Sequence, residues 1–244
     1  MYYDNDYAII IPMANEEKDF HPFADELITV LNRLESGRVY FIVDNASKDR
    51  TLEICKELSE KDIRFITVWA PENKNVVDAY LRGYREALAH GHDIIIEMDA
   101  GLSHDPRAVP MFLRTLNEGN ECAFGSRFIN GGSIWKSSGK RTFLSKTGTI
   151  LSNILLGSKL KDMTSGYQGF HAHIVKEFLA YPLQSKAHFY QTELRYLLRE
   201  KRYREIPIHY RAPSPSVSSK AIRNSIYVLL FYFVHRLFFH SRKI

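Results

Sequence analysis

The first 125 residues alternate short apolar runs of strand length with segments of helical spacing. The apolar runs span residues 7–12, 39–43, 63–68, 93–98 and 121–125. Helical segments fall between them at 23–34, 51–58 and 76–89, and a further helix is predicted to open at Pro106. This alternation is typical of βαβ units, in which consecutive strands lie parallel and helices cover the sheet. We therefore expect an α/β fold with a Rossmann-like, mostly parallel central sheet flanked by helices.

Polar clusters follow three of these predicted strands at the point where each strand ends. They are Asn15-Glu16-Glu17, Asp44-Asn45-Ala46-Ser47 and Asp99-Ala100-Gly101. Because ligands of parallel sheets bind outside the carboxyl ends of the strands, we expect these carboxylates to gather along one edge. Mg²⁺ and Mn²⁺ take carboxylate and phosphate oxygens together, so the pattern predicts a nucleotide diphosphate held through a divalent ion. The alternative is that these acids are solvated helix N-caps.

The second half of the chain is more mixed. Residues 126–140 are predicted as a loop, 140–156 and 188–201 as helices, 203–210 as a strand and 221–240 as a final apolar helix. Residues 212–219 are rich in Pro and Ser, which is typical of a mobile loop. We accordingly predict one domain over 1–211, followed over 212–244 by a mobile loop and a C-terminal helix.

Length, charge and cysteine content limit the class of protein. A chain of 244 residues fits a single domain with a short appendage. Its net charge of +5 fits phosphate-bearing substrates or an anionic membrane surface, with an ordinary basic soluble protein as the alternative. Two cysteines without metal-site spacing, Cys55 and Cys122, and a polar N-terminus without a signal peptide favour a cytoplasmic location. We expect no nucleic-acid partner.

The C-terminal segment carries an apolar run at 226–234, with Arg223 before it and His235 and Arg236 after it. The run is shorter than the roughly 20 apolar residues that a bilayer span needs. An apolar helix with aromatic and basic residues is typical of the membrane interface, so we expect a protein that lies peripherally at the membrane. The alternative is a helix packed on the core or on a second subunit of a homo-oligomer.

Five blocks of the sequence, in this order, resemble glycosyltransferase family 2, and in particular its dolichyl- or polyprenyl-phosphate sugar (mannose) synthase branch. The blocks are residues 11–17, residues 43–51, residues 97–106, residues 125–128 continuing through Gly131, Gly132, Trp135 and Arg141, and residues 162–167. The last block, DMTSGY, is the most specific to this branch. The resemblance covers nearly the whole chain, over residues 7–220, and implies a GT-A fold.

The resemblance also implies roles for particular residues in binding a nucleotide-sugar donor. Pro12, Glu16 and Asp44 would contact the nucleoside, and Asp99 would hold the metal and the nucleotide. Guanidinium groups match phosphate geometry, and the phosphate-facing residues would be Arg127, Arg141, Arg211 and Lys220. The full predicted donor site comprises Pro12, Ala14, Glu16, Asp44, Asp99, Ala100, Arg127, Arg141, Arg211 and Lys220. The loop at 212–219 would close over the donor and exclude water.

Several positions depart from the family pattern. The metal block normally carries two aspartates two residues apart, and the second is replaced here by Gly101, which supplies no side-chain ligand. We therefore expect weakened binding of Mg²⁺ or Mn²⁺, with Asp99 and Ser103 as ligands. Asp105 is a further candidate ligand, or a cap of the helix that opens at Pro106. Three further departures are Ala14 for a common aromatic residue that could stack on the base, Asn45 for a common aspartate, which is a mild change, and Gln168 for a common arginine.

The predicted activity is inverting transfer of a hexose from a nucleotide-sugar to a polyprenyl phosphate, with Asp99 and Arg127 in catalytic roles. A lipid phosphate is already an anionic nucleophile, so it needs positioning more than proton removal. A glycan hydroxyl, the alternative acceptor in surface polysaccharide assembly, needs a general base. Glu193 is the candidate catalytic base, unless it is a solvent-facing or capping helix residue. A third hypothesis, motivated by Gly101, is a non-catalytic subunit that binds nucleotide-sugars.

Overall fold

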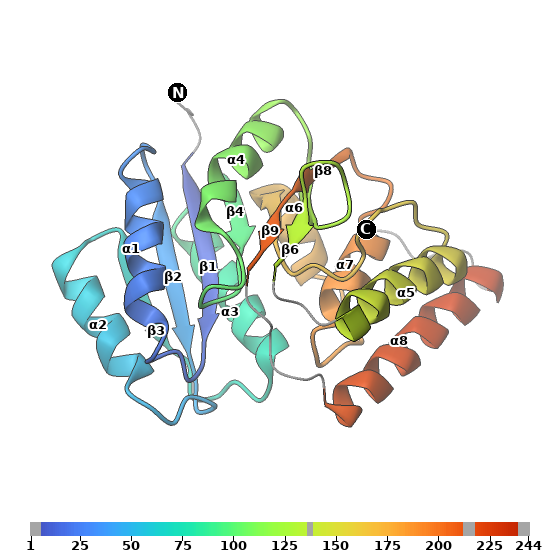
Figure 1. Ribbon diagram of the computed structural model, residues 1–244, viewed down its shortest axis with the longest axis horizontal. Coiled ribbons are helices and arrows are strands. Elements are labelled where there is room, and N and C mark those ends of the chain that lie inside the picture. Colours follow the sequence, from blue (N-terminus) through green and yellow to red (C-terminus); the bar gives the residue numbers. More distant parts are fainter. Residues whose placement is uncertain (1–5, 136–138, 212–217, 239–244) are drawn as a thin grey trace.

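The computed structural model describes residues 6–135, 139–211 and 218–238, which form a twisted sheet with helices on both faces (Figure 1). The main sheet has seven strands in the order β3-β2-β1-β4-β7-β5-β8. Their bounds are β1 (Tyr7–Met13), β2 (Arg38–Val43), β3 (Phe65–Trp69), β4 (Ile94–Glu97), β5 (Cys122–Ser126), β7 (Gln168–His171) and β8 (Tyr203–Pro207). A second sheet pairs β6 (Ser133–Ile134) with β9 (His209–Tyr210).

The pairing pattern of the main sheet confirms the expected mostly parallel architecture. β1 lies between β2 and β4 and is parallel to both, and β3 is parallel to β2. β7 runs antiparallel between β4 and β5, while β8 is parallel to β5. The carboxyl ends of β1, β2 and β4 therefore meet at one edge of the sheet, where the three polar clusters begin.

Helices cover both faces of this sheet. They are α1 (Phe20–Leu31), α2 (Thr51–Lys61), α3 (Val76–Ala89), α4 (Val109–Asn117), α5 (Gly139–Leu156), α6 (Ala172–Leu179), α7 (Tyr190–Leu197) and α8 (Ser219–Phe238), with a 3-10 turn η1 (Pro106–Ala108) before α4. Successive residues of a strand point to opposite faces, so Ala8 and Ile10 join one apolar core while Ile9 and Ile11 join the other. Burial on both faces explains why the strands are continuous apolar runs.

The largest differences from the sequence prediction lie after residue 165. β7 and α6 were not predicted, and the strand predicted over 203–210 divides into β8 and β9. β7 has only four residues, QGFH, and lacks the apolar run that marks the parallel strands. It pairs with β4 and β5 by long-range contacts that its own sequence does not signal.

The C-terminal helix α8 packs on the core with one face and leaves the other exposed. Val228, Leu229 and Tyr232 are buried, and the Tyr232 hydroxyl donates to Glu193 Oε1 at 2.6 Å. Within the described residues, no helix is both long enough and apolar enough to cross a bilayer. The predicted boundary near residue 212, and most of the predicted closing loop, fall at 212–217, outside the described residues, so both stay predictions.

Candidate active site

The loops that follow β1 and β2 are joined through Asn15. Its backbone has a φ of 59°, a left-handed conformation that asparagine tolerates better than most residues. The Asn15 N–H donates to Ser47 Oγ at 3.1 Å, and its amide nitrogen donates to the carbonyl of Ala46 at 3.1 Å. Its Oδ1 accepts from the Lys48 N–H at 2.8 Å. Two of the predicted polar clusters thus form one rigid unit.

Glu16 connects this unit to the loop that follows β4. Its N–H donates to Thr51 Oγ1 at 2.8 Å, which fixes the start of its half-buried side chain. The carboxylate reaches Gly101, where a Cβ atom would lie 2.9 Å from Glu16 Oε2. Burial, and then the negative charges of Asp19, Asp99 and Asp49, raise the pKa of Glu16 to about 7. The third predicted cluster therefore lies against the first.

Asp99 follows β4 and has a side chain that is 32% exposed. The Tyr80 hydroxyl of α3 donates to Asp99 Oδ1, and the Asp99 N–H donates to Nδ1 of the buried His104 at 3.0 Å. Burial alone would raise the pKa of Asp99, but His104 and the Tyr80 hydroxyl, together with His188 and Arg127, lower it by more, so the pKa lies below its usual value. Asp99 is consequently a preoriented carboxylate that is ionised at neutral pH.

The remaining residues predicted on these loops lie at the same edge. Pro12 is half-buried near the end of β1, and Ala14 is exposed directly after the strand. Asp44 is buried, and its Oδ1 accepts from the Ala46 N–H at 2.8 Å. Ala100 is half-buried beside Asp99. The structure therefore brings the predicted nucleoside-binding residues together, while their roles stay predictions.

A cluster of buried polar contacts surrounds Glu97, two residues before Asp99. Glu97 is fully buried, and burial raises its pKa to about 7. Its carboxylate accepts from the Tyr84 hydroxyl at 2.8 Å, from Gln168 Nε2 at 3.1 Å and from Gln191 Nε2 at 3.0 Å. Gln168, which departs from the family pattern, thus serves Glu97 as an uncharged donor.

The block at 162–167 packs against this cluster through a glycine. A Cβ atom on Gly166 would lie 2.5 Å from Gln191 Nε2 and 3.2 Å from Asp99 Oδ1, so no larger side chain fits there without a shift. Sequence reasoning gave Tyr80, His104, Gln191 and Gly166 no individual role. Only Gly166 and His104 carried a signal, because they lie within two of the five sequence blocks that resemble the family.

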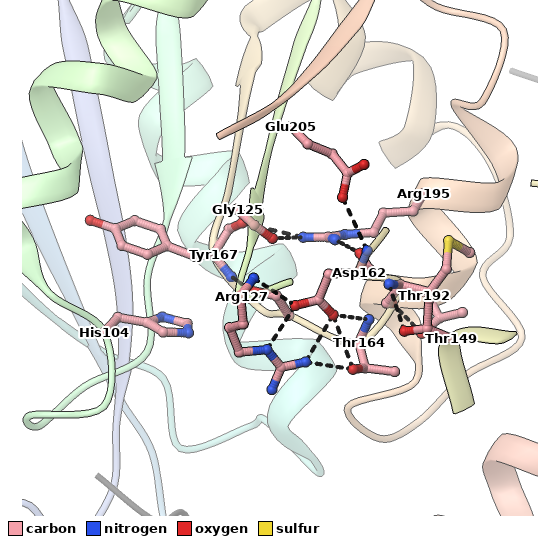
Figure 2. Close-up of polar contacts among 12 residues, drawn as sticks. His104, Gly125, Arg127, Thr149, Asp162, Thr164, Tyr167, Thr192, Arg195 and Glu205 are labelled. Atoms are coloured by element: carbon pink, nitrogen blue, oxygen red, sulfur yellow. Dashed lines mark hydrogen bonds and ion pairs between the residues drawn. The ribbon is translucent and has the colours of Figure 1, made fainter. Parts of the chain in front are cut away.

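Asp162 holds the second half of the site together (Figure 2). Its fully buried carboxylate accepts from Arg127 Nε at 2.7 Å and Nη2 at 2.8 Å, and from the N–H groups of Arg127 and Thr164. Arg195, from α7, is also buried and donates to the carbonyls of Asp162, Gly125 and Tyr167. The Asp162 N–H donates to Glu205 of β8 at 3.0 Å.

Comparison with known proteins assigns this arrangement to a family. Residues 8–179 match the model of "Glycosyl transferase family 2". The chain belongs to glycosyl transferase family 2. This confirms the resemblance drawn from the five sequence blocks, and with it the prediction of a glycosyltransferase.

Three curated relatives of the chain carry the names of lipid-linked mannose synthases or mannosyltransferases. The chain is 30% identical to a polyprenol monophosphomannose synthase of Mycolicibacterium smegmatis over 190 residues, covering 76% of this chain and 69% of the relative. It is 28% identical to an undecaprenyl-phosphate mannosyltransferase of Micrococcus luteus over 206 residues, covering 82% of each. A dolichol-phosphate mannosyltransferase of Pyrococcus furiosus is 31% identical over 168 residues, with 68% of this chain and 45% of the relative covered.

Solved structures confirm the fold. Glucosyl-3-phosphoglycerate synthase from Mycobacterium tuberculosis, in complex with Mn²⁺, uridine diphosphate and phosphoglyceric acid, superimposes with a TM-score of 0.68. The alignment covers 93% of this family 2 chain and 78% of that one, at 17% identity. A complex of the same synthase with Mg²⁺ and uridine diphosphate gives a TM-score of 0.65. The GT-A class expected from the sequence is therefore correct.

Two of the arginines predicted to face phosphates, Arg127 and Arg211, form ion pairs within the protein. Arg127 is only 8% exposed, and its guanidinium is bound by Asp162 and by Thr164 Oγ1 at 2.6 Å. It thus positions the block at 162–167, and its predicted phosphate contact stays a prediction. Arg211 forms ion pairs with Glu26 and, at 3.4 Å, with Asp105.

The other two predicted phosphate-facing residues lie on helices α8 and α5. Lys220 is exposed in the first turn of α8, where its predicted contact stays open. Arg141 belongs to α5, but its side chain lies outside the described part of the structure.

Glu193, the candidate catalytic base, lies in the core, so the alternative of a solvent-facing helix residue is wrong. Its side chain is fully buried, and its two carboxylate oxygens accept from the N–H groups of Gln184 at 2.6 Å and Ser185 at 2.9 Å. Burial raises the pKa of this carboxyl. With the Tyr232 hydroxyl as a further donor, Glu193 anchors α8 to the core, and it could meet an acceptor hydroxyl only if these contacts broke.

Ser103 and Asp105, two of the candidate metal ligands, lie in the segment between β4 and α4. In the described residues, no group of three or more His, Cys, Asp or Glu side chains is placed to hold a metal ion. Ser103 is half-buried, and its carbonyl accepts from the Arg211 N–H at 3.0 Å. Asp105 accepts from the Arg107 N–H at 3.0 Å and pairs with the Arg107 guanidinium, which confirms the capping alternative for this residue.

We predict that Asp162→Asn lowers the free energy of unfolding by about 3–5 kcal/mol, because it leaves the buried Arg127 charge without its partner. Urea unfolding followed by circular dichroism measures the change. The control is Glu53→Gln, which removes the exposed Arg50–Glu53 pair and should leave the stability almost unchanged, because solvent screens exposed ion pairs. Equal, small losses in both variants would show that the Asp162 cluster does not hold the fold together.

Proposed function

We propose that this chain transfers a hexose, with inversion, from a nucleotide-sugar to a polyprenyl phosphate at a membrane surface. The observation that carries the proposal is the meeting of Glu16, Asp44 and Asp99 at the carboxyl edge of three parallel strands. This is where α/β sheets bind their ligands, and the similar relatives of the chain are named for lipid-phosphate acceptors.

The carboxylates at this edge fit a divalent ion that is shared with a diphosphate. Mg²⁺ is usually bound through one or two carboxylates together with substrate phosphates, so the site does not need three protein ligands. Asp99 is ionised and partly exposed, and Glu16 lies beside the same loop. These residues would hold Mg²⁺ or Mn²⁺, which supplies positive charge next to the departing nucleoside diphosphate.

The position of Glu193 favours a phosphate acceptor over a glycan hydroxyl. A hydroxyl acceptor requires a base within hydrogen-bond reach, and the acid considered for that task is bound by backbone N–H groups and Tyr232. A phosphate acceptor arrives ionised and requires no base. Transfer to a glycan hydroxyl, and a non-catalytic binding subunit, remain the two alternatives that the experiments below address.

The outer faces of α5 and α8 suit contact with a membrane. The two helices lie side by side (Figure 1), and Arg236 of α8 donates to the carbonyls of Ile154 and Leu155 of α5. We call their exposed apolar side chains the α5–α8 face: Phe143, Leu144, Ile150, Leu151, Ile154, Ile222, Ile226, Leu230, Val234, Leu237 and Phe238. The members from α8 recur at helical spacing and form one stripe.

The charge of these helices fits an anionic surface. Neither α5 nor α8 contains an Asp or Glu residue, whereas Lys146, Lys220, Arg223 and Arg236 are exposed on them. Basic residues beside an apolar stripe are typical of helices that lie in the membrane interface. We therefore place this glycosyltransferase peripherally on the cytoplasmic side of a membrane, with a second copy of the chain as the alternative occupant of the face.

A transfer assay tests the proposal directly. Radiolabelled nucleotide-sugars, with guanosine and uridine diphosphate hexoses among them, are incubated with undecaprenyl phosphate in vesicles and Mn²⁺. We expect label in the lipid phase with at least one donor, and a loss of at least about a hundredfold in rate for Asp99→Asn, because the leaving diphosphate loses its metal-holding carboxylate. Label that appears only on added glycan would favour the hydroxyl acceptor. Donor binding without any product would favour the non-catalytic subunit.

We also predict that Ile154→Asp weakens binding to anionic vesicles roughly tenfold, because burying an aliphatic side chain contributes about 1.5–3 kcal/mol. Co-sedimentation measures the binding, and transfer to a short water-soluble prenyl phosphate should be unchanged. Ile63→Asp is the matched control. Ile63 is 80% exposed just before β3, the outer strand at the opposite side of the sheet from β8. Equal vesicle binding by both variants, or dimers of wild type that Ile154→Asp dissociates, would contradict membrane contact through this face.

A further inference from the structure

The carboxylate of Glu16 and any side chain at residue 101 compete for the same space. Gly101 is buried with a φ of 68°, and a Cβ atom there would stand 2.9 Å from Glu16 Oε2. That distance is too short for a carbon atom that is not bonded to the oxygen. An aspartate at residue 101 could therefore not coexist with Glu16 in its present position.

We propose that Glu16 supplies, in this chain, the second carboxylate for the divalent ion, in the place that a side chain at residue 101 would otherwise occupy. The inference rests on the proposed use of a metal-bound nucleotide-sugar and names the residue that completes its site. Gly101 then is the residue that leaves room for Glu16 beside Asp99.

The way in which Glu16 is held supports this role. Its N–H is bound by Thr51 Oγ1, which in turn donates to Asp49 Oδ1 at 2.5 Å, and the preceding Asn15 is tied to the loop after β2. The carboxylate is thus presented from a backbone fixed on both sides. The backbone that carries this side chain therefore loses little conformational freedom when an ion binds.

The charge around Glu16 supports the same role. The charges that act on its carboxyl come from Asp19, Asp99 and Asp49, and all are negative. Among the described residues, no Lys, Arg or His forms an ion pair with Glu16. Negative charges near a partly buried carboxylate raise its free energy unless a proton or a metal ion is bound. A divalent ion between Glu16 and Asp99 would relieve this repulsion.

Glu16 was first expected to contact the nucleoside, and the two roles can be separated by what each variant loses. If Glu16 contacts the nucleoside, its removal weakens nucleotide binding equally with and without metal. If Glu16 is a metal ligand, its removal weakens binding of the ion itself, while the affinity for the nucleotide without metal is preserved.

The test measures Mn²⁺ binding by electron paramagnetic resonance of the free ion, in the presence of uridine or guanosine diphosphate. We expect Glu16→Ala to weaken Mn²⁺ binding at least about tenfold, because the number of charged ligands sets the affinity of such sites. Asp19→Asn is the matched control: it removes a neighbouring negative charge whose side chain caps no helix N–H, and it should change Mn²⁺ affinity by less than about threefold.

Exchange of the two positions gives the sharpest outcome. Gly101→Asp alone should not strengthen Mn²⁺ binding, because the new side chain meets Glu16. Glu16→Ala with Gly101→Asp should recover most of the affinity that Glu16→Ala loses, since aspartate tolerates a left-handed backbone better than most residues. Melting curves without metal confirm that each variant is folded.

Two results would overturn the inference, and they differ in their reach. If Glu16→Ala binds Mn²⁺ as wild type does while Asp99→Ala does not, the metal site stands and Glu16 is not part of it. If wild type binds no Mn²⁺ with either diphosphate and transfers no sugar, the inference and the proposed function fail together.

Discussion

The parallel pairing of β1 with β2 and with β4 is the constraint on which the site depends. It places the loops after Met13, Val43 and Glu97 at one edge, so acids that are far apart in sequence become neighbours. Asn15 then ties the first two loops, and Glu16 and Gly101 bring the first against the third. Repulsion among these acids makes the edge unfavourable by itself and favourable for a cation. This edge is where we propose that a metal-bound diphosphate binds.

A buried ion pair between Arg127 and Asp162 fixes the second half of the chain beside these loops. Asp162 neutralises Arg127, and Arg195 binds the carbonyls that surround Asp162, so the block at 162–167 is fixed between β5, α7 and β8. Gly166 lets this block reach Asp99. A buried ion pair of this kind stabilises little in comparison with apolar packing, but removing one partner is costly, so it specifies one arrangement of the loop. The same half carries the α5–α8 face, which would bring a lipid acceptor towards the donor edge.

Much of the first half could be predicted from the sequence, because strands that are buried on both faces must be continuous apolar runs. The predicted bounds of α3 match the structure, and the predicted strands overlap β1 to β5. Strand β7 could not be predicted, because its four residues form a strand only by pairing with distant strands. One of them, Gln168, donates to Glu97. The carboxylates could be placed since strand ends are visible in the sequence. The partners of Arg127 and Glu193 could not be predicted, because an ion pair or a backbone N–H contact across more than seven residues leaves no local pattern.

The central claim is that the carboxyl edge of β1, β2 and β4 receives the nucleotide part of the donor. Amide hydrogen exchange, measured with and without nucleoside diphosphate and Mn²⁺, tests it most directly, since bound ligand suppresses local opening. The account predicts slowed exchange in residues 14–17, 44–48 and 98–103, with little change in the outer strand β3. Protection confined to other segments, with these three loops unchanged, would contradict it.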